Sequence, residues 1–148
     1  MPRKTLGNIR EDGDKMKIST RGRYGLKAMV DIAANSQEGC VSLKSIAERT
    51  NLSESYLEQL IAPLKKAGLV KSTRGANGGY ILGRNAKDIS VGDVLRVVEG
   101  PLELVDCLKG GESCGMGDCS SCATKDVWAR LSDSVSETAD NINLSELI

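Results

Sequence analysis

Apolar residues in the first half of the chain recur with the spacing of amphipathic helices. In the first such segment the positions i, i+3, i+4 and i+7 are all apolar, and they are Leu26, Met29, Val30 and Ala33. This spacing predicts a helix that begins near Ser19 and ends at the polar segment NSQEG. The next segment, SLKSIAERT, predicts a second and shorter helix, because the serine at its start can accept hydrogen bonds from free backbone N–H groups.

A third helix is predicted over ESYLEQLIAPLKKAG, with Ser53 before it as the N-cap. One face of this helix carries an apolar stripe that consists of Leu57, Leu60, Ile61 and Leu64. Pro63 lies inside the pattern, where it removes one backbone hydrogen bond and is expected to bend the helix. Gly68 is expected to end it.

Two short strands and another helix follow. The segment LVKSTRGANGGYIL predicts strands over residues 69–73 and 80–82, joined by a glycine-rich turn. Ser90 and Asp93 have the spacing of a capping box, which predicts a helix through Val98. Two short helices, a turn, a third helix and a hairpin form the order of a winged helix-turn-helix, whose third helix enters the major groove of DNA.

The last helix is predicted from about Thr124 to Asn141, and one of its faces is apolar. The residues on that face are Trp128, Leu131, Val135 and Ile142. A terminal helix with such a stripe needs an apolar partner, and a second copy of the chain supplies one. We therefore expect a homodimer that forms through this helix.

These elements predict a mainly α fold with a small β-hairpin, namely a winged helix-turn-helix with a long C-terminal dimerisation helix. The chain then divides into four parts. They are a disordered extension (1–15), the winged helix-turn-helix DNA-binding domain (16–100), a cysteine-rich cluster-binding loop (101–123), and the dimerisation helix with its tail (124–148).

If the stripe of the third helix faces the core, the opposite face is free to read DNA. That face carries Ser55, Glu58, Gln59, Ala62 and Lys66. Serine and glutamine can bond to base edges, and glutamate can accept from the amino group of cytosine. Because phosphates repel its charge, Glu58 is expected to read cytosine or to penalise wrong sites. A solvated helix face is the alternative.

Basic residues elsewhere in the first half are also candidates for DNA contacts. In the hairpin turn Gly75 lets the backbone approach phosphates, while the Arg74 guanidinium can enter a narrow minor groove. An ordinary surface arginine is the alternative. Contacts to phosphates, which orient a protein without reading sequence, are expected from Lys17, Arg21, Arg23 and Lys27.

The net charge of zero conceals an uneven distribution. Residues 16–87 contain 12 Lys and Arg against 5 Asp and Glu, a net +7, whereas residues 88–148 contain 4 against 12, a net −8. The asymmetry favours a polyanion-binding half joined to a half with another task. No segment reaches the roughly 20 apolar residues that cross a bilayer. The start also lacks an apolar signal core, so we expect no membrane contact and a cytoplasmic protein.

Four of the five cysteines lie within the stretch CLKGGESCGMGDCSSC, as Cys107, Cys114, Cys119 and Cys122. Four thiolates on a glycine-rich loop can converge on one soft centre, which favours an iron–sulfur cluster, zinc or copper(I) in a reducing compartment. Structural zinc and regulatory thiols remain open. Acidic neighbours are expected to disfavour free thiolates, so we do not expect a thiol oxidoreductase or another enzyme. Cys40 is expected to be a small buried side chain.

Four segments resemble the Rrf2 family of bacterial transcription regulators, and the cysteines resemble those of its iron–sulfur cluster regulator branch. The segments are MKISTRGRYGLKAMVDIA, LSESYLEQLIAPLKKAGLVKSTRGANGGYIL, ISVGDVLRVVEG and ATKDVWARLSDSV. The resemblance implies a homodimeric regulator, a repressor in type, with a cluster, often 2Fe-2S, in the loop before the dimerisation helix. It also implies DNA-reading positions at Ser53, Ser55, Tyr56, Glu58, Gln59, Arg74 and Gly75.

The ligand pattern departs from that branch, whose best-known form has three cysteines and a histidine, because this chain contains no histidine. One alignment places Cys122 at the histidine position, and the other places Lys125 there. Lysine is a poor ligand, so we favour four thiolates, which suit 2Fe-2S and also 4Fe-4S. Cluster-assembly proteins are then expected partners.

Two alternatives to cluster sensing stay open. A second branch of the same family, which controls cysteine metabolism by binding a partner enzyme, resembles the chain through EQLIAPLKKAGLV. The other alternative is a zinc-stabilised repressor.

Overall fold

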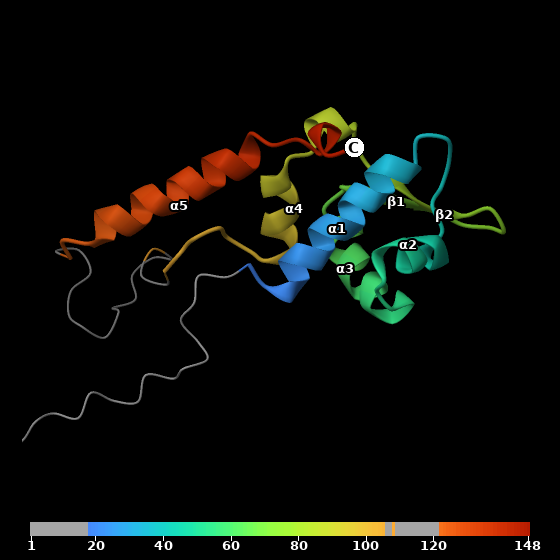
Figure 1. Ribbon diagram of the computed structural model, residues 1–148, viewed down its shortest axis with the longest axis horizontal. Helices are drawn as coiled ribbons and strands as arrows, with labels where there is room; N and C mark the ends of the chain where they lie inside the picture. Colours follow the sequence, from blue (N-terminus) through green and yellow to red (C-terminus); the bar gives the residue numbers. More distant parts are fainter. Residues whose placement is uncertain (1–17, 106–107, 109–121) are drawn as a thin grey trace, which may run out of the picture.

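The computed structural model describes residues 18–105, 108 and 122–148, and within them the chain is mainly helical with one antiparallel hairpin (Figure 1). The predicted fold class is confirmed. The elements are α1 (Thr20–Asn35), α2 (Leu43–Thr50), α3 (Glu54–Lys66), β1 (Val70–Thr73), β2 (Gly79–Leu82), η1 (Ala86–Asp88), α4 (Val91–Val98), α5 (Lys125–Asp140) and η4 (Leu144–Glu146).

Serine side chains cap four of the helices, at the positions that the sequence predicts. Each accepts a hydrogen bond from a backbone N–H of the first turn at 3.0–3.3 Å, and the four are Ser19, Ser42, Ser53 and Ser90. Asp93 completes the capping box, because its carboxylate accepts from the Ser90 N–H at 3.0 Å. These caps satisfy amide groups that have no partner inside the helix, and so they fix where each helix begins.

The core lies between α1, α3, α4 and the hairpin. The predicted stripe of α3 points into it, since Leu57, Leu60, Ile61 and Leu64 are each at most 2% exposed. The helix continues through Pro63 to Lys66, which is feasible because proline removes a single hydrogen bond of the ladder. Cys40 is half-buried, so it is less enclosed than the sequence predicts.

A backbone pairing joins the hairpin to the segment between α1 and α2. Its strands pair from Val70 with Leu82 to Thr73 with Gly79. Val41 forms an isolated bridge to Tyr80, with two backbone hydrogen bonds of 2.8 and 2.9 Å. A side chain at Gly79 would overlap the Val41 backbone, which explains the glycine there.

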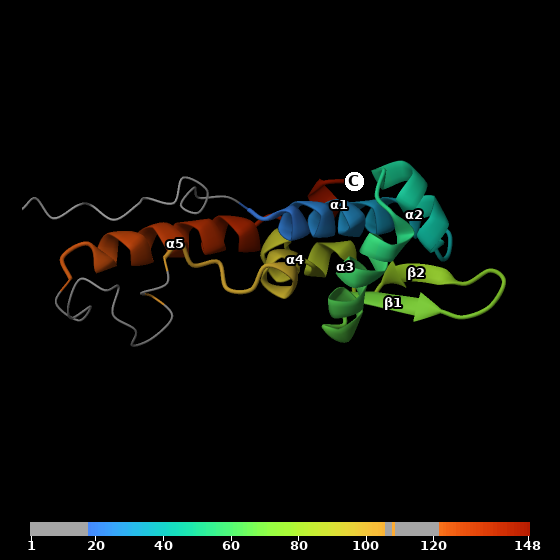
Figure 2. The same cartoon turned by 90° about the horizontal axis from the view of Figure 1, so that it is seen from below.

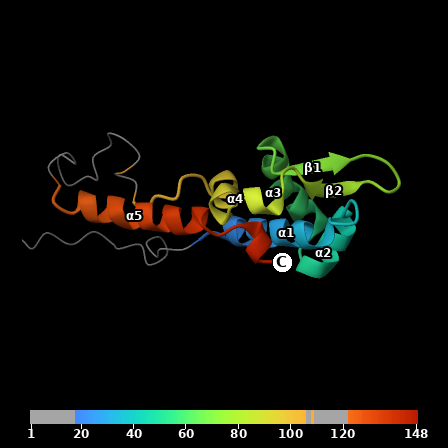
Figure 3. The same ribbon diagram turned by 90° about the horizontal axis from the view of Figure 1, so that it is seen from above.

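The molecule is elongated, with the hairpin at one end and α5 extending from the other (Figures 1 and 2). We call the part from α1 to α4, together with η4, the head. Figure 3 shows that the C-terminal end of α5 meets the head beside α4, while the rest of the helix projects away from it. Within the described residues, no helix has the length and apolar character to span a membrane.

The residues after α5 return to the head and become part of its core. Val91 donates its N–H to the carbonyl of Ile142 at 2.8 Å, and Leu144 donates to the carbonyl of Ile89 at 2.9 Å. The Leu144 side chain is fully buried in the main core cluster. The sequence pattern did not predict this attachment.

Candidate nucleic-acid interface and thiol site

The face of α3 opposite its apolar stripe is open to solvent. All five residues that the periodicity assigns to it are exposed, and they are Ser55, Glu58, Gln59, Ala62 and Lys66. The rest of the helix is held against the core, so these side chains are presented on a rigid element. Rigid presentation is what base-edge recognition in the major groove requires.

Tyr56 and Ser53 differ from the other predicted DNA-reading residues of α3, because both also hold the helix in place. The rings of Tyr56 and Tyr24 meet edge to face, with centroids 6.2 Å apart and planes at 87°. The Arg23 guanidinium lies 5.9 Å from the Tyr24 ring centroid. Such aromatic and cation–π contacts stabilise the approach of two helices. The start of α3 is therefore fixed against the first turns of α1.

The N-terminal turn of α1 is itself bound to the end of α4. The Glu99 carboxylate accepts hydrogen bonds from the backbone N–H groups of Ser19 at 2.7 Å and Gly22 at 3.1 Å, and from the Ser19 hydroxyl. A side chain at Gly22 would overlap this carboxylate. A negative charge at a helix N-terminus is favourable. The sequence pattern did not predict this contact; a glycine inside a helical pattern indicates only that something packs closely there.

Of the four basic residues predicted to contact phosphates, the structure describes three. Arg21 and Arg23 are exposed near the start of α1, whereas Lys17 lies outside the described residues. Lys27 is also exposed, and its ammonium donates to the Thr50 carbonyl at 2.9 Å, which caps the end of α2. Its contact with phosphate stays a prediction.

The hairpin turn is the most protruding part of the head (Figure 2). Arg74 and Gly75 are both exposed there, and Gly75 has a φ of +116°, which side-chain-bearing residues rarely adopt. Its carbonyl accepts from the Gly78 N–H at 3.0 Å, which closes the turn. The glycine therefore shapes the turn that presents Arg74.

Of the four predicted thiolate ligands only Cys122 is described, and Cys107, Cys114 and Cys119 lie outside the described residues. No three metal-ligating side chains converge in the part of the chain that the structure describes. The exposed Cys122 thiol lies 3.3 Å from the Thr124 hydroxyl. That hydrogen bond, followed by backbone N–H groups and the charge of Lys125, holds its pKa below the ordinary value.

The lowered pKa of Cys122 differs from the sequence prediction, which expected acidic neighbours to disfavour thiolates. The local donors at the start of α5 have the larger effect. A thiolate that is exposed and stabilised in this way fits the donor chemistry of a soft metal centre. The charge of Lys125 also lowers this pKa.

The free face of α5 carries an apolar stripe in which Val127, Leu131 and Val135 are 49%, 43% and 41% exposed. The periodicity places Leu131 and Val135 on this apolar face, and both lie there. Trp128, which it also places there, is half-buried, whereas Val127 was not predicted to belong to the face. Ile142 does not belong to this stripe. It follows the end of α5 and packs on the head with Val91, Leu95 and Ala139.

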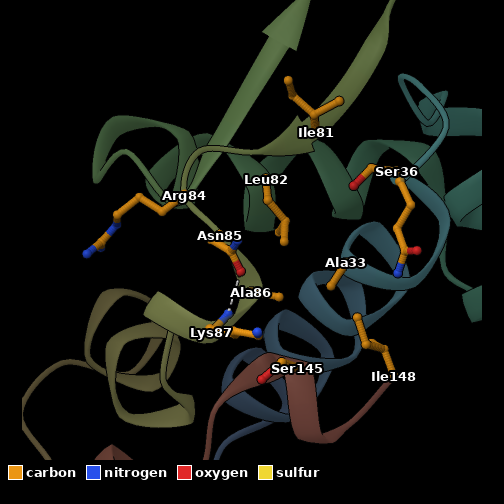
Figure 4. A pocket seen from close by; sticks show the side chains of 11 residues that line it. Ala33, Ser36, Ile81, Leu82, Arg84, Asn85, Ala86, Lys87, Ser145 and Ile148 are labelled. Atoms are coloured by element: carbon orange, nitrogen blue, oxygen red, sulfur yellow. Dashed lines mark hydrogen bonds between the residues drawn. The ribbon is translucent and has the colours of Figure 1, made fainter.

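A hollow of about 470 Å³ lies between the end of α1, β2, η1 and η4 (Figure 4). Its lining is apolar around Ala33, Leu82 and Ile148, and the exposed Arg84 extends away from these side chains. Asn85 is engaged with the backbone N–H of Lys87 at 3.0 Å. None of the polar side chains that line the hollow is fully buried. It does not bring a set of polar groups together around a ligand.

Comparison with known proteins supports the architecture of this interface. The family described as "Rrf2: Iron-dependent Transcriptional regulator" matches residues 18–148. The HTH-type transcriptional regulator CymR of Bacillus subtilis is 49% identical over 132 residues, which cover 89% of each chain. The HTH-type transcriptional regulator IscR of Pectobacterium atrosepticum is 47% identical over 133 residues, which cover 90% of this chain and 79% of IscR.

Two solved structures of such regulators are also similar to this chain. CymR, the global cysteine regulator of B. subtilis, superposes with a TM-score of 0.75 at 47% identity, covering 90% of this chain and 96% of CymR. IscR of T. potens has a TM-score of 0.72 at 51% identity, covering 89% and 85% respectively. The chain is thus similar to both regulators over most of its length.

Proposed function

The chain belongs to the Rrf2 family of DNA-binding transcriptional regulators, and from this premise we propose that it is a cytoplasmic homodimer whose cysteine segment holds an iron–sulfur cluster and controls operator binding. Its relatives are named as regulators, which confirms the expectation that it is not an enzyme. Membership of a DNA-binding family also supports double-stranded DNA as a partner.

The exposed face of α3 enters the major groove in this proposal, and the hairpin turn contacts the adjoining backbone and minor groove. The exposure of Ser55, Glu58 and Gln59 on a rigid helix supports base reading. Arg74 at the protruding turn, and Arg21 and Arg23 at the start of α1, supply positive charge on the head. Ser53 and Tyr56 position α3 and lie at the edge of its reading face.

Dimerisation occurs through the free face of α5. An apolar stripe that includes Val127, Leu131 and Val135 on a helix projecting from the head supports this arrangement. Burying it in a second copy removes apolar surface from water. Trp128 lies beside the stripe, whereas Ile142 contributes to the packing of α5 on its own head.

The observation that carries the cluster proposal is the set of four cysteines within sixteen residues, which ends in the exposed thiol of Cys122. Cys107, Cys114, Cys119 and Cys122 would hold the cluster, 2Fe-2S in first place and 4Fe-4S in second. The bound group would supply redox and oxygen sensitivity. The similarity to IscR and the family's description as iron-dependent support the same reading, and cluster-assembly proteins would load the site.

A second candidate function is control of cysteine metabolism without a cluster. The similarity to CymR favours it. A zinc-stabilised repressor is a variant of this candidate, because the same thiolates also suit zinc.

Purification under anaerobic conditions, with counts of iron, acid-labile sulfide and zinc per protomer, distinguishes these candidates. We expect iron and sulfide in equal amounts, together with visible absorption bands. A colourless protein that contains neither after reconstitution would exclude the cluster, and zinc in their place would favour the zinc-stabilised form.

Glu58→Ala is expected to relax the choice between operators. If Glu58 reads cytosine, its removal should reduce discrimination at one base pair by about 1–3 kcal/mol while the affinity for the best site changes little. Affinities measured on duplexes with each base substituted in turn test this. Unchanged relative affinities at every position would show that Glu58 is not a reader.

Arg74→Ala is the contrasting change at the hairpin turn. We expect it to weaken operator binding and to lower the salt dependence by about one released counterion. Titrations at several salt concentrations measure both quantities. Lys87→Ala is the matched control, because it removes an exposed positive charge from the head away from the hairpin turn.

A further inference from the structure

The joint between α5 and the head is built from several different contacts. Backbone hydrogen bonds join residues 142 and 144 to residues 91 and 89. An apolar cluster includes Ala139, Val91 and Leu95. In addition the Ser132 hydroxyl, which is buried on α5, accepts at 3.0 Å from the N–H of Leu104, in the segment that follows α4. The helix therefore leaves the head in a defined direction.

One ion pair lies across this joint. The Arg96 guanidinium of α4 makes two hydrogen bonds to the Asp140 carboxylate at the end of α5, at 2.5 and 2.9 Å. A bidentate pair of this kind fixes the relative orientation of its two planar groups. The interaction raises the pKa of Arg96 and lowers that of Asp140, so the pair stays ionised near neutral pH.

A buried glycine accommodates the pair. A Cβ atom at Gly92 would overlap both the Asp140 carboxylate and the Arg96 guanidinium. Gly92 is the second residue of α4, and it is buried against the end of α5. Its presence at this place fits a requirement for the close approach of α5 to α4.

We propose that Gly92, Arg96 and Asp140 act as positioning residues that set the angle between the dimerisation helix and the DNA-binding head, and thereby the half-site spacing that the dimer accepts. The inference rests on the proposed homodimer and is independent of the cluster. The side chains of Arg96 and Asp140 are 39% and 45% exposed, and exposed ion pairs contribute little to stability. Removing the pair should therefore leave the fold intact while it loosens the orientation that the two hydrogen bonds favour.

The length of α5 makes the spacing sensitive to this angle. Its 16 residues span about 24 Å at 1.5 Å per residue. A rotation of about 8° at the head end then moves the far end by about 3.4 Å, the rise of one base pair. A small loosening of the joint is thus enough to change the register of the two heads by one base pair.

The test uses an operator selected from random duplexes with the unaltered protein, and versions of it with base pairs inserted or deleted at its centre. Asp140→Asn and Arg96→Gln remove one charge each, and Gly92→Ala displaces the pair while keeping both charges. We expect each variant to reduce the preference for the selected spacing by about two- to fivefold, the most that an exposed ion pair contributes. Affinity for a single half-site should stay unchanged.

Arg49→Gln is the matched control, because it breaks the other bidentate ion pair, between Arg49 of α2 and Asp31 of α1, inside the head. It should leave the spacing preference unaltered. A preference that is retained in all three joint variants, or that is reduced equally by Arg49→Gln, would overturn the inference. An unaltered protein that is monomeric in sedimentation would instead refute the dimer on which the inference rests.

Discussion

Cys122→Ser is expected to abolish the visible absorption and the bound iron of anaerobically purified protein. Serine removes the soft sulfur donor while preserving size, and oxygen is a much poorer ligand for a cluster. The helical content and the affinity for a single DNA half-site should change little, because Cys122 is exposed and lies before α5. Absorption spectra, iron analysis and circular dichroism measure the three quantities.

Two control variants make this result specific. Cys40→Ser changes the cysteine that lies outside the cysteine segment, and it should retain the full absorption. Lys125→Ala tests the alternative alignment, in which residue 125 occupies the histidine position. We expect Lys125→Ala to keep the cluster, and loss of absorption in that variant would show that the four-thiolate assignment is wrong.

Leu144→Ala is expected to lower the free energy of unfolding by about 2–5 kcal/mol, the usual cost of truncating a fully buried leucine. Leu144 is 0% exposed and belongs to the main core cluster, although it comes after the dimerisation helix. Its loss also weakens the attachment of α5 to the head. Urea unfolding at a fixed protein concentration measures the change.

Leu147→Ala is the matched control for that measurement. It makes the same change three residues later at a side chain that is 43% exposed. We expect an effect within about 0.5 kcal/mol, as for most surface substitutions. Equal effects of the two variants would mean that the chain after α5 is not part of the core.

The sequence predicts those parts of the fold that depend on neighbouring residues. Serine caps are local, because the serine and the N–H group it serves are three residues apart, and this is why the starts of four helices agree with the prediction. The apolar stripe of α3 is likewise visible in the periodicity alone. From it follow the buried Leu57 and the exposed Glu58 and Gln59.

Contacts between distant residues could not be predicted in this way. The carboxylate of Glu99 reaches the start of α1, 77 residues before it at Gly22. The Lys27 ammonium donates to the Thr50 carbonyl at the end of α2. Ile142 continues the heptad-like pattern of the last helix in sequence, yet the helix ends at Asp140 and the chain turns onto the head. Each outcome depends on where another element lies in space.

The affinity of the same operator for cluster-loaded and metal-stripped protein tests the proposed function most directly. If the cluster controls operator binding, the two forms should differ in affinity by at least about fivefold on some natural promoters, within the usual range of coupling between two sites. Equal affinities of both forms on every promoter, with iron and sulfide counts confirming their loading, would contradict cluster sensing and leave a DNA-binding regulator with a different signal.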